Sequence, residues 1–302
     1  MKQNESKKRN MKEFRLEERI FPRAMITPTL IVLLVMTAYP LIFTLIYSFT
    51  DYNYLKGMDN AHFILFKNYS TLIKNSYFRQ ALVNTVKFTF LAVAFEMVIG
   101  LLIALFVHGM HRGKKVMRTL LLLPYLLPTV TVALSWRMML SVNYGIVNQF
   151  LTSLGLPVFN WFMDTRTAFG TILVIDVWQN APFVFLLLYA ALQSVPEELY
   201  EAARIDGAGK LQQFHYVTYP HLRTSIALCA LMRSIDTFRL FEKVNILTGG
   251  GPAGTTSTIT QFLYTYGISN LKFGFGSAGA VVMTILVLLI SSIYIKRAIN
   301  NK

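Results

Sequence analysis

Long apolar blocks alternate with short polar segments along this chain. Each block reaches about 20 residues, the length that a helix needs to cross the hydrocarbon core of a bilayer. The pattern predicts an all-α membrane protein with six transmembrane helices. The expected spans are residues 24–49, 82–107, 118–140, 171–192, 222–247 and 276–295.

Two of the six spans depart from a plain apolar helix. Pro124 and Pro128 interrupt the third span, and membrane bundles tolerate such prolines where neighbouring groups bond the freed carbonyls. The fifth span carries several charges and ends in the run Thr248-Gly249-Gly250-Gly251-Pro252. This run lacks the Gly-Lys-Ser/Thr ending of a phosphate-binding loop, so we exclude nucleotide binding there. We expect it to break the helix at the outer surface, before an outer loop that leads to the last span.

A polar segment, residues 194–207, lies between the fourth and fifth spans and has the features of a complete short helix. Ser194 and Glu197 match a capping box, and Pro196 suits the first turn. Gly207 can adopt the left-handed conformation that ends a helix. The segment is either an ordinary solvated loop helix or a helix that a partner protein grips.

Composition and charge support a membrane protein. The 302 residues are 54% hydrophobic and 15% charged, with a mean hydropathy of +0.46. In a soluble protein the net charge of +14 would suggest nucleic acid, but here the basic residues cluster at the ends of apolar blocks. That placement fits membrane topology and anionic lipid instead, so we expect no nucleic-acid partner. The single cysteine, Cys229, excludes an internal disulfide and a cysteine metal cluster.

The distribution of Lys and Arg predicts the orientation. Six spans place both termini on one side, where the segments hold 18 Lys and Arg residues against 6 on the other side. The richer side is expected to be cytoplasmic. The predicted organisation is a basic cytoplasmic arm, a six-span domain with a cytoplasmic loop, and a short cytoplasmic tail. Their bounds are 1–23, 24–298 (loop 194–220) and 299–302. The first apolar block is too long for a cleaved secretory signal.

Charged residues recur at every third position of the fifth span, at Arg233, Asp236, Arg239 and Glu242. On one helix this spacing forms a stripe, and ionisable groups inside a membrane normally face a wet pathway or the bundle interior. The stripe either lines a transport pathway or makes structural salt bridges. Phe238 beside Arg239 would offer an aromatic platform and a hydrogen-bonding fork, which suits a polyhydroxylated or anionic ligand.

Polar residues also interrupt the fourth span, at Asp176, Gln179 and Asn180, with Phe183 close behind. Amides and aromatic faces suit the hydroxyls and C–H faces of a sugar. The alternative is helix–helix hydrogen bonding, which polar residues in bundles often supply. Glu96 is an isolated carboxylate within the second span, and we expect it to pair with an arginine of the fifth span.

The chain carries no pattern of a catalytic site. It contains neither His-Glu-x-x-His nor Gly-x-Ser-x-Gly, and its five histidines are scattered. We therefore expect no enzyme and no metal site. A stand-alone secondary transporter or channel remains an alternative, with Glu96 or Asp236 handling protons and residues 194–207 forming a plain loop.

A motif in the predicted cytoplasmic loop narrows the choice. The chain reads Glu201-Ala202-Ala203, Gly207, Val217 and Tyr219-Pro220 at the spacing of the signature Glu-Ala-Ala, three residues, Gly, nine residues, branched residue, one residue, Leu-Pro. In this respect it resembles the permease subunits of binding-protein-dependent ABC sugar importers of the maltose and glycerol-phosphate type. Tyr219 replaces the usual Leu. The resemblance covers about residues 24–298 and extends to further motifs, among them Pro124–Pro128, Ile205–Ala208 and Leu247–Pro252.

The resemblance implies the fold and the partners. The fold would be that of a type I ABC importer permease, in a bacterial cytoplasmic membrane. The chain would pair with a second, similar permease, and two ATPase subunits would bind ATP and Mg, so no cofactor is expected in this chain. A solute-binding protein outside would deliver the sugar for import. The implied ATPase-coupling residues are Glu201, Ala202, Ala203, Asp206 and Gly207.

The resemblance also implies ligand positions. Matching by motif places them on Gln179, Asn180 and Phe183 of the fourth span, and on Phe238 and Arg239 of the fifth. The side chains differ from those of maltose-type relatives at several of these positions. The predicted substrate pathway combines them with the other polar residues of the two spans, and comprises Asp176, Gln179, Asn180, Phe183, Asp236, Phe238, Arg239 and Glu242.

Overall fold

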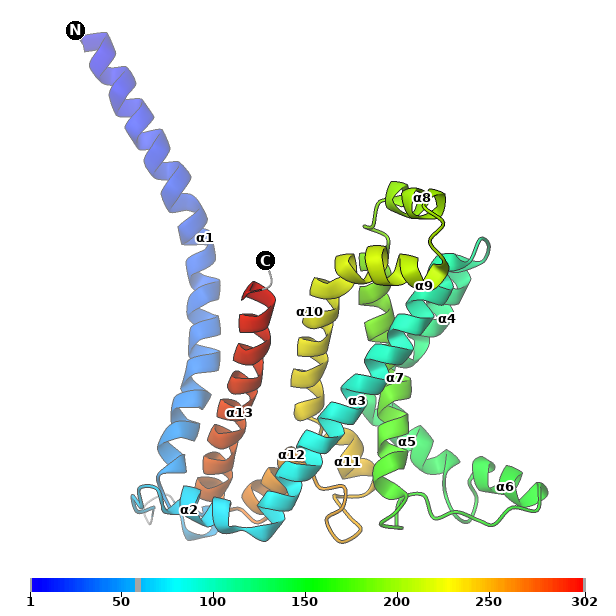
Figure 1. The fold of residues 1–302 in the computed structure, drawn as a ribbon. Helices are drawn as coiled ribbons and strands as arrows, with labels where there is room; N and C mark the ends of the chain where they lie inside the picture. The colour runs from blue at the N-terminus through cyan, green and yellow to red at the C-terminus, as the bar shows by residue number, and fades with distance from the viewer. Residues whose placement is uncertain (1, 58–60, 301–302) are drawn as a thin grey trace.

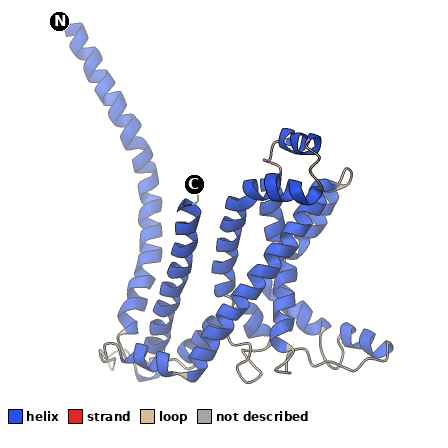
Figure 2. Ribbon diagram, viewed as in Figure 1, coloured by secondary structure: helices blue, strands red, loops and turns tan. Residues whose placement is uncertain are grey.

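A computed structural model describes residues 2–57 and 61–300, and within these ranges the chain is helical except for loops and one isolated bridge between Thr50 and Phe63 (Figure 2). In chain order the elements are α1 (Lys2–Ser48), η1 (Tyr54–Lys56), α2 (Lys67–Lys74), α3 (Ser76–Gly109), α4 (Lys114–Leu126), α5 (Thr129–Met139), α6 (Ile146–Ser153), α7 (Ala168–Leu192), α8 (Glu197–Ile205), α9 (Lys210–Gln213), η3 (Phe214–Thr218), α10 (Tyr219–Phe238), α11 (Glu242–Leu247), α12 (Ile259–Leu263), η4 (Tyr264–Ser269) and α13 (Phe273–Asn300).

Within the part of the chain that the structure describes, four helical segments are long and apolar enough to cross a membrane. They are Met25–Ser48 of α1, α3, α7 and Phe273–Tyr294 of α13. The bent pair α4–α5 would make a fifth. α10 covers the predicted fifth span only up to Phe238 and carries charged residues. The predicted membrane class is confirmed, and the count of six spans stays a prediction.

The helices form a bundle with two distinct ends (Figure 1). α1 and α13 lie side by side, and α7 packs against α3, α4 and α10. Both chain termini lie at the same end of the molecule as α8 and α9, while α2, α6 and the loop after α11 lie at the opposite end. This arrangement agrees with the predicted placement of both termini and residues 194–207 on one side.

The third predicted span is sharply broken. α4 and α5 meet at an angle of 88° around Leu127 and Pro128. Proline favours an extended conformation in the residue before it, and Leu127 has φ −76° and ψ 137°. Its carbonyl oxygen accepts a hydrogen bond of 3.0 Å from Gln179 Nε2 on α7. Pro124 lies within α4 without ending it.

The fifth predicted span is not one helix, so the prediction of a single charged stripe is wrong. α10 ends at Phe238 and α11 begins at Glu242. Arg239 occupies the C-cap with φ −95° and ψ 12°, and the hydroxyl of Thr258 donates to the carbonyl of Leu240 at 2.9 Å. A bond from a residue 18 positions away thus stabilises the break.

The predicted outer loop before the last span contains a packed helical segment. Ile259 and Phe262 of α12 are buried, and Phe262 stacks on Tyr266 of η4 with ring centroids 4.4 Å apart. Gly267 of η4 lies so close to α13 that a Cβ there would stand 2.7 Å from the Cα of Gly276. The last helix accordingly begins at Phe273, three residues before the predicted position.

Close contact between α3 and α7 organises the centre of the bundle. A Cβ added at Gly100 of α3 would lie 2.6 Å from Cβ of Val184 on α7. Around this contact Ala104, Phe185 and Leu188 are buried in one apolar cluster. Gly100 therefore allows the two helices to approach more closely than any side chain would.

We expect Gly100→Ala to destabilise the bundle by about 1–3 kcal/mol, because overpacking a close contact forces its neighbours apart. Gly109→Ala is the matched control, since Gly109 also lies in α3 and has no atom within 4 Å of its added Cβ. The measurement is the thermal unfolding midpoint of the detergent-solubilised protein. Equal midpoints for the two variants would contradict the close packing.

Candidate functional site: an exposed coupling loop and a buried charge network

Helix α8 stands away from the bundle and ends as its sequence predicts (Figure 1). Gly207 has φ 76°, and its N–H donates to the carbonyl of Arg204 at 3.1 Å. The N–H of Ala208 donates to the carbonyl of Ala203 at 2.9 Å. These two bonds form a Schellman motif, so the prediction that Gly207 ends this helix is confirmed.

The start of α8 differs from the prediction. Ser194 does not cap the helix, because its hydroxyl donates to the carbonyl of Ala191 at 2.7 Å, at the end of α7. Pro196 is the N-cap residue, with φ −59° and ψ 133°, and lies just before the first turn. The predicted capping box of Ser194 and Glu197 is therefore wrong. Glu197 and Glu198 instead place negative charge in the first turn, where the helix dipole favours it.

The loop from α8 to η3 presents apolar side chains to the surroundings. Ile205 is 86% exposed and Leu211 is 85% exposed. A hydrogen bond of 3.0 Å between the hydroxyls of Tyr200 and Thr218 holds α8 over the start of α10. The predicted coupling residues are exposed, except Ala203, which is half-buried; the exposed ones are Glu201, Ala202, Asp206 and Gly207.

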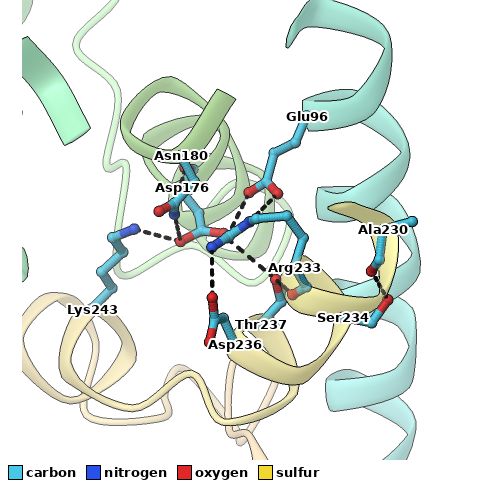
Figure 3. A network of polar contacts seen from close by, with 9 residues as sticks. All are labelled: Glu96, Asp176, Asn180, Ala230, Arg233, Ser234, Asp236, Thr237 and Lys243. Carbon is cyan, nitrogen blue, oxygen red and sulfur yellow. Dashed lines mark hydrogen bonds and ion pairs between the residues drawn. The ribbon is translucent and has the colours of Figure 1, made fainter. Parts of the chain in front are cut away.

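A network of charged side chains is buried inside the bundle (Figure 3). Arg233 of α10 makes two bonds to Glu96 of α3, with Nε 2.7 Å from Oε2 and Nη2 3.1 Å from Oε1. Its Nη1 lies 3.4 Å from Oδ2 of Asp236. Glu96 is fully buried and Arg233 is 5% exposed. The predicted pairing of Glu96 with an arginine of the fifth span is confirmed.

A second buried ion pair lies beside the first. Lys243 of α11 contacts the carboxylate of Asp176 on α7 through Nζ and Oδ1, and both residues are 2% exposed. Asn180 donates to the same Oδ1 at 2.9 Å. The other carboxylate oxygen, Oδ2, is buried and has no hydrogen-bond partner among the residues that the structure describes. The two pairs together are electrically neutral and join α3, α7, α10 and α11.

The pairing of Lys243 with Asp176 did not follow from the sequence pattern. Lys243 falls outside the three-residue spacing, and the break after α10 alone directs it back toward α7. The sequence could still have indicated this pair. Asp176 and Lys243 carry opposite charges in two predicted spans, and buried charges need partners.

The predicted pathway residues of α7 are engaged with the protein itself. Gln179 is buried and bonds the freed carbonyl of Leu127, while Asn180 bonds Asp176. The ring of Phe183 lies 5.3 Å from that of Tyr125. In this conformation Gln179 and Phe183 contact α4 and its C-cap residue, as in the alternative to ligand binding, whereas Asn180 bonds within α7.

The predicted pathway residues around the α10–α11 break fall into two groups. Asp236, Arg239 and Glu242 are exposed. Phe238 is 2% exposed and belongs to an apolar cluster with Phe78 and Phe262. Phe238 and Arg239 therefore do not form the predicted joint platform in this conformation. The pathway role of the exposed charges stays a prediction.

Comparison with known families identifies the class of protein. Residues 96–300 match the family described as binding-protein-dependent transport system inner membrane component. This chain belongs to that family. It is thus a membrane-embedded permease subunit of a transporter that depends on a solute-binding protein, and the alternative of a stand-alone transporter or channel is wrong.

Two similar proteins extend over most of the chain. The trehalose/maltose transport system permease protein MalF of Thermococcus litoralis is 35% identical over 273 residues, which are 90% of this chain and 91% of that protein. The sulfoquinovosyl glycerol transport system permease protein SmoG of Agrobacterium fabrum is 32% identical, over 93% of this chain and 91% of that protein. The predicted resemblance to sugar permeases is confirmed.

A solved structure shows the same fold. A chain of a bacterial ABC transporter involved in the import of the acidic polysaccharide alginate superimposes with a TM-score of 0.84. The match covers 97% of this chain and 99% of that chain at 23% identity. The predicted fold of a type I importer permease agrees with this likeness.

We expect Arg233→Ala to destabilise the permease by about 3–5 kcal/mol, because it leaves the carboxylate of Glu96 buried and unpaired. Arg239→Ala is the control, since this arginine is exposed and should change stability by less than about 0.5 kcal/mol. Replacing both partners, as Glu96→Leu with Arg233→Leu, should recover most of the loss. Thermal unfolding in detergent measures all three, and equal losses for the two arginine variants would contradict the network.

Proposed function

We propose that this chain is a permease subunit of an ATP-driven ABC importer that moves a sugar or sugar derivative, an oligosaccharide or anionic saccharide included, into the cytoplasm. Support for the substrate class comes from the relatives, whose names specify trehalose or maltose and sulfoquinovosyl glycerol. The main support for coupling to ATP is the position of α8. This capped helix stands away from the bundle, and its last residue, Ile205, is exposed.

Two ATPase subunits bind ATP and Mg, so this chain needs no cofactor and is not itself an enzyme. One ATPase receives α8 through Glu201, Ala202, Ala203, Asp206 and Gly207. A short helix with apolar groups left in solvent is suited to a cleft, because docking removes those groups from water.

Coupling follows from the connections of the loop. α8 is joined on one side to the end of α7 and on the other, through α9 and η3, to the start of α10. ATP-driven closure of the ATPase pair shifts α8, and the shift biases two packings of α7 and α10. Alternating access requires only such a two-state element and no covalent chemistry in this chain.

The remaining partners bind at other surfaces. A second, similar permease packs against this one in the cytoplasmic membrane, and a solute-binding protein docks at the end opposite α8. N- and C-termini are cytoplasmic, as the excess of Lys and Arg predicts.

The substrate passes between α7 and the α10–α11 break. Exposed charges at the break are available to ligand in the present conformation, whereas the polar groups on α7 become available when the helices repack. The residues of this pathway are Asp176, Gln179, Asn180, Phe183, Asp236, Phe238, Arg239 and Glu242.

We expect Gly207→Val to abolish ATP-dependent uptake of maltose and trehalose in proteoliposomes, with the subunit still folded. Gly155→Val is a matched control: both glycines have φ 76°, and neither has an atom within 4 Å of an added Cβ. The backbone strain is therefore the same in both, and only Gly207 lies where the ATPase would contact the permease. Uptake of at least half the wild-type rate is expected for the control.

Two outcomes would contradict the proposal. Equal uptake by the two glycine variants would remove α8 from the coupling step. Wild-type uptake that ignores ATP and follows a proton gradient would overturn the importer itself. Glu201→Arg adds a separate measurement, since co-purification with the ATPase at the wild-type yield would show that this carboxylate does not anchor α8.

A further inference from the structure

A recess of about 210 Å³ opens at the end of the molecule opposite α8. One wall consists of the aromatic rings of Tyr77, Phe262 and Tyr266. Tyr77 and Tyr266 are stacked with centroids 6.3 Å apart, and Tyr266 stacks on Phe262 at 4.4 Å. Three aromatic side chains, supplied by α3, α12 and η4, thus line the recess.

Backbone of the glycine-rich run also lines the recess. Gly249–Gly251 and Gly254 line it, together with Ser257. Gly250 has φ 90°, and an added Cβ there would lie 3.1 Å from Cγ of Gln261. Glycine at this position thus leaves the recess open while the chain turns tightly against α12.

Hydrogen bonds hold the loop in place against α3. Asn84 Nδ2 donates to the carbonyls of Gly254 and Ser257, at 2.9 and 3.1 Å. Gln80 Nε2 donates to the carbonyl of Ala253 at 3.2 Å. Gln261 Nε2 bridges the carbonyl of Gly249 and the hydroxyl of Thr265, each at 3.4 Å. The shape of the recess is therefore fixed before any ligand arrives.

Several polar groups at the recess remain available. The hydroxyls of Tyr77, Tyr266 and Ser257 and the amide oxygen of Gln80 make no hydrogen bond to any other residue that the structure describes. They comprise three hydroxyls, which donate and accept, and one acceptor. Such groups around an aromatic face match the hydroxyls and C–H face of a pyranose ring.

Charge and size restrict the ligand further. Every residue that lines the recess is uncharged. An anionic group would find no cation among them. The volume corresponds to about seven water molecules at ~30 Å³ each, which suits one sugar ring rather than a chain of several.

We propose that this recess is an outer subsite that holds one neutral sugar ring of the substrate, before that ring enters the pathway between α7 and α10. The assignment rests on the proposed function, because only import from the side opposite α8 places the recess on the entry route. It adds to that function a site upstream of the α10–α11 break and a preference for an uncharged terminal ring.

Protection of an introduced cysteine tests the subsite directly. Cys229 is the one cysteine of the chain and is fully buried, so Ser257→Cys creates a reactive thiol in the recess. The complete transporter in nanodiscs is treated with a maleimide, without binding protein, in the presence of maltose or trehalose. We expect saturating sugar to slow labelling at position 257 about 5-fold or more. Ser153→Cys, exposed at the same end on α6, should label at an unchanged rate.

A graded series at Tyr77 tests the aromatic face. Tyr77 is 59% exposed and lies in the first turn of α3, so its truncation should leave folding intact. In the Ser257→Cys background, Tyr77→Ala should raise the half-protecting sugar concentration about 3- to 10-fold, because it removes one of the aromatic rings that line the recess. Tyr77→Phe should raise it less. Tyr144→Ala, an exposed tyrosine outside the recess, should not change it.

The outcomes separate the subsite from the transport function. The subsite alone would be overturned if ATP-driven uptake is intact but sugar slows maleimide labelling neither of Ser257→Cys nor of a second variant, Thr265→Cys. Failure of ATP-driven uptake of any saccharide by the wild type would overturn the proposed function. Sugar-free binding protein could also slow labelling at position 257. If it does so as strongly as sugar does, the recess is a contact surface for that protein, and the subsite is overturned.

Discussion

Two ion pairs are buried at the centre of this permease, and the arrangement of four helices depends on them. Each charge costs several kcal/mol to remove from water, and a partner must recover that cost. Arg233 can reach Glu96 only if α10 lies against α3, and Lys243 can reach Asp176 only if α11 returns to α7. The second ion pair therefore also requires the break after Phe238, because a straight helix would carry Lys243 past Asp176.

The pairs also limit how the helices can move. The loop that carries α8 is attached to α7 and α10, and both helices contribute a charged residue to the network. A movement that separated either pair would cost about 3–5 kcal/mol, whereas a movement that keeps both intact avoids this cost. Repacking of α7 and α10 is thus favoured to proceed by shifts that keep both ion pairs intact.

The sequence predicted what depends on neighbouring residues or on broad hydropathy. The helical membrane class, the end of α8 at Gly207 and the pairing of Glu96 with an arginine were recoverable in this way. The break at Arg239 was not, because it depends on Thr258 and on Asp176, which are distant in the chain. The predicted capping box is wrong for a local reason. The carbonyl of Ala191, at the end of α7, accepts the hydrogen bond of the Ser194 hydroxyl.

The candidate pathway shows the same division. Arg233, Asp236, Arg239 and Glu242 have equivalent spacing in the sequence, yet Arg233 is buried and the other three are exposed. Only contacts with α3 distinguish them, so spacing alone could not separate a structural charge from one that a ligand can reach. Uncharged groups surround the outer recess, and exposed charges mark the α10–α11 break. A saccharide that enters by this route therefore meets stacking and neutral hydrogen bonds before it meets charge, which favours an uncharged ring at the leading end whatever the rest of the substrate carries.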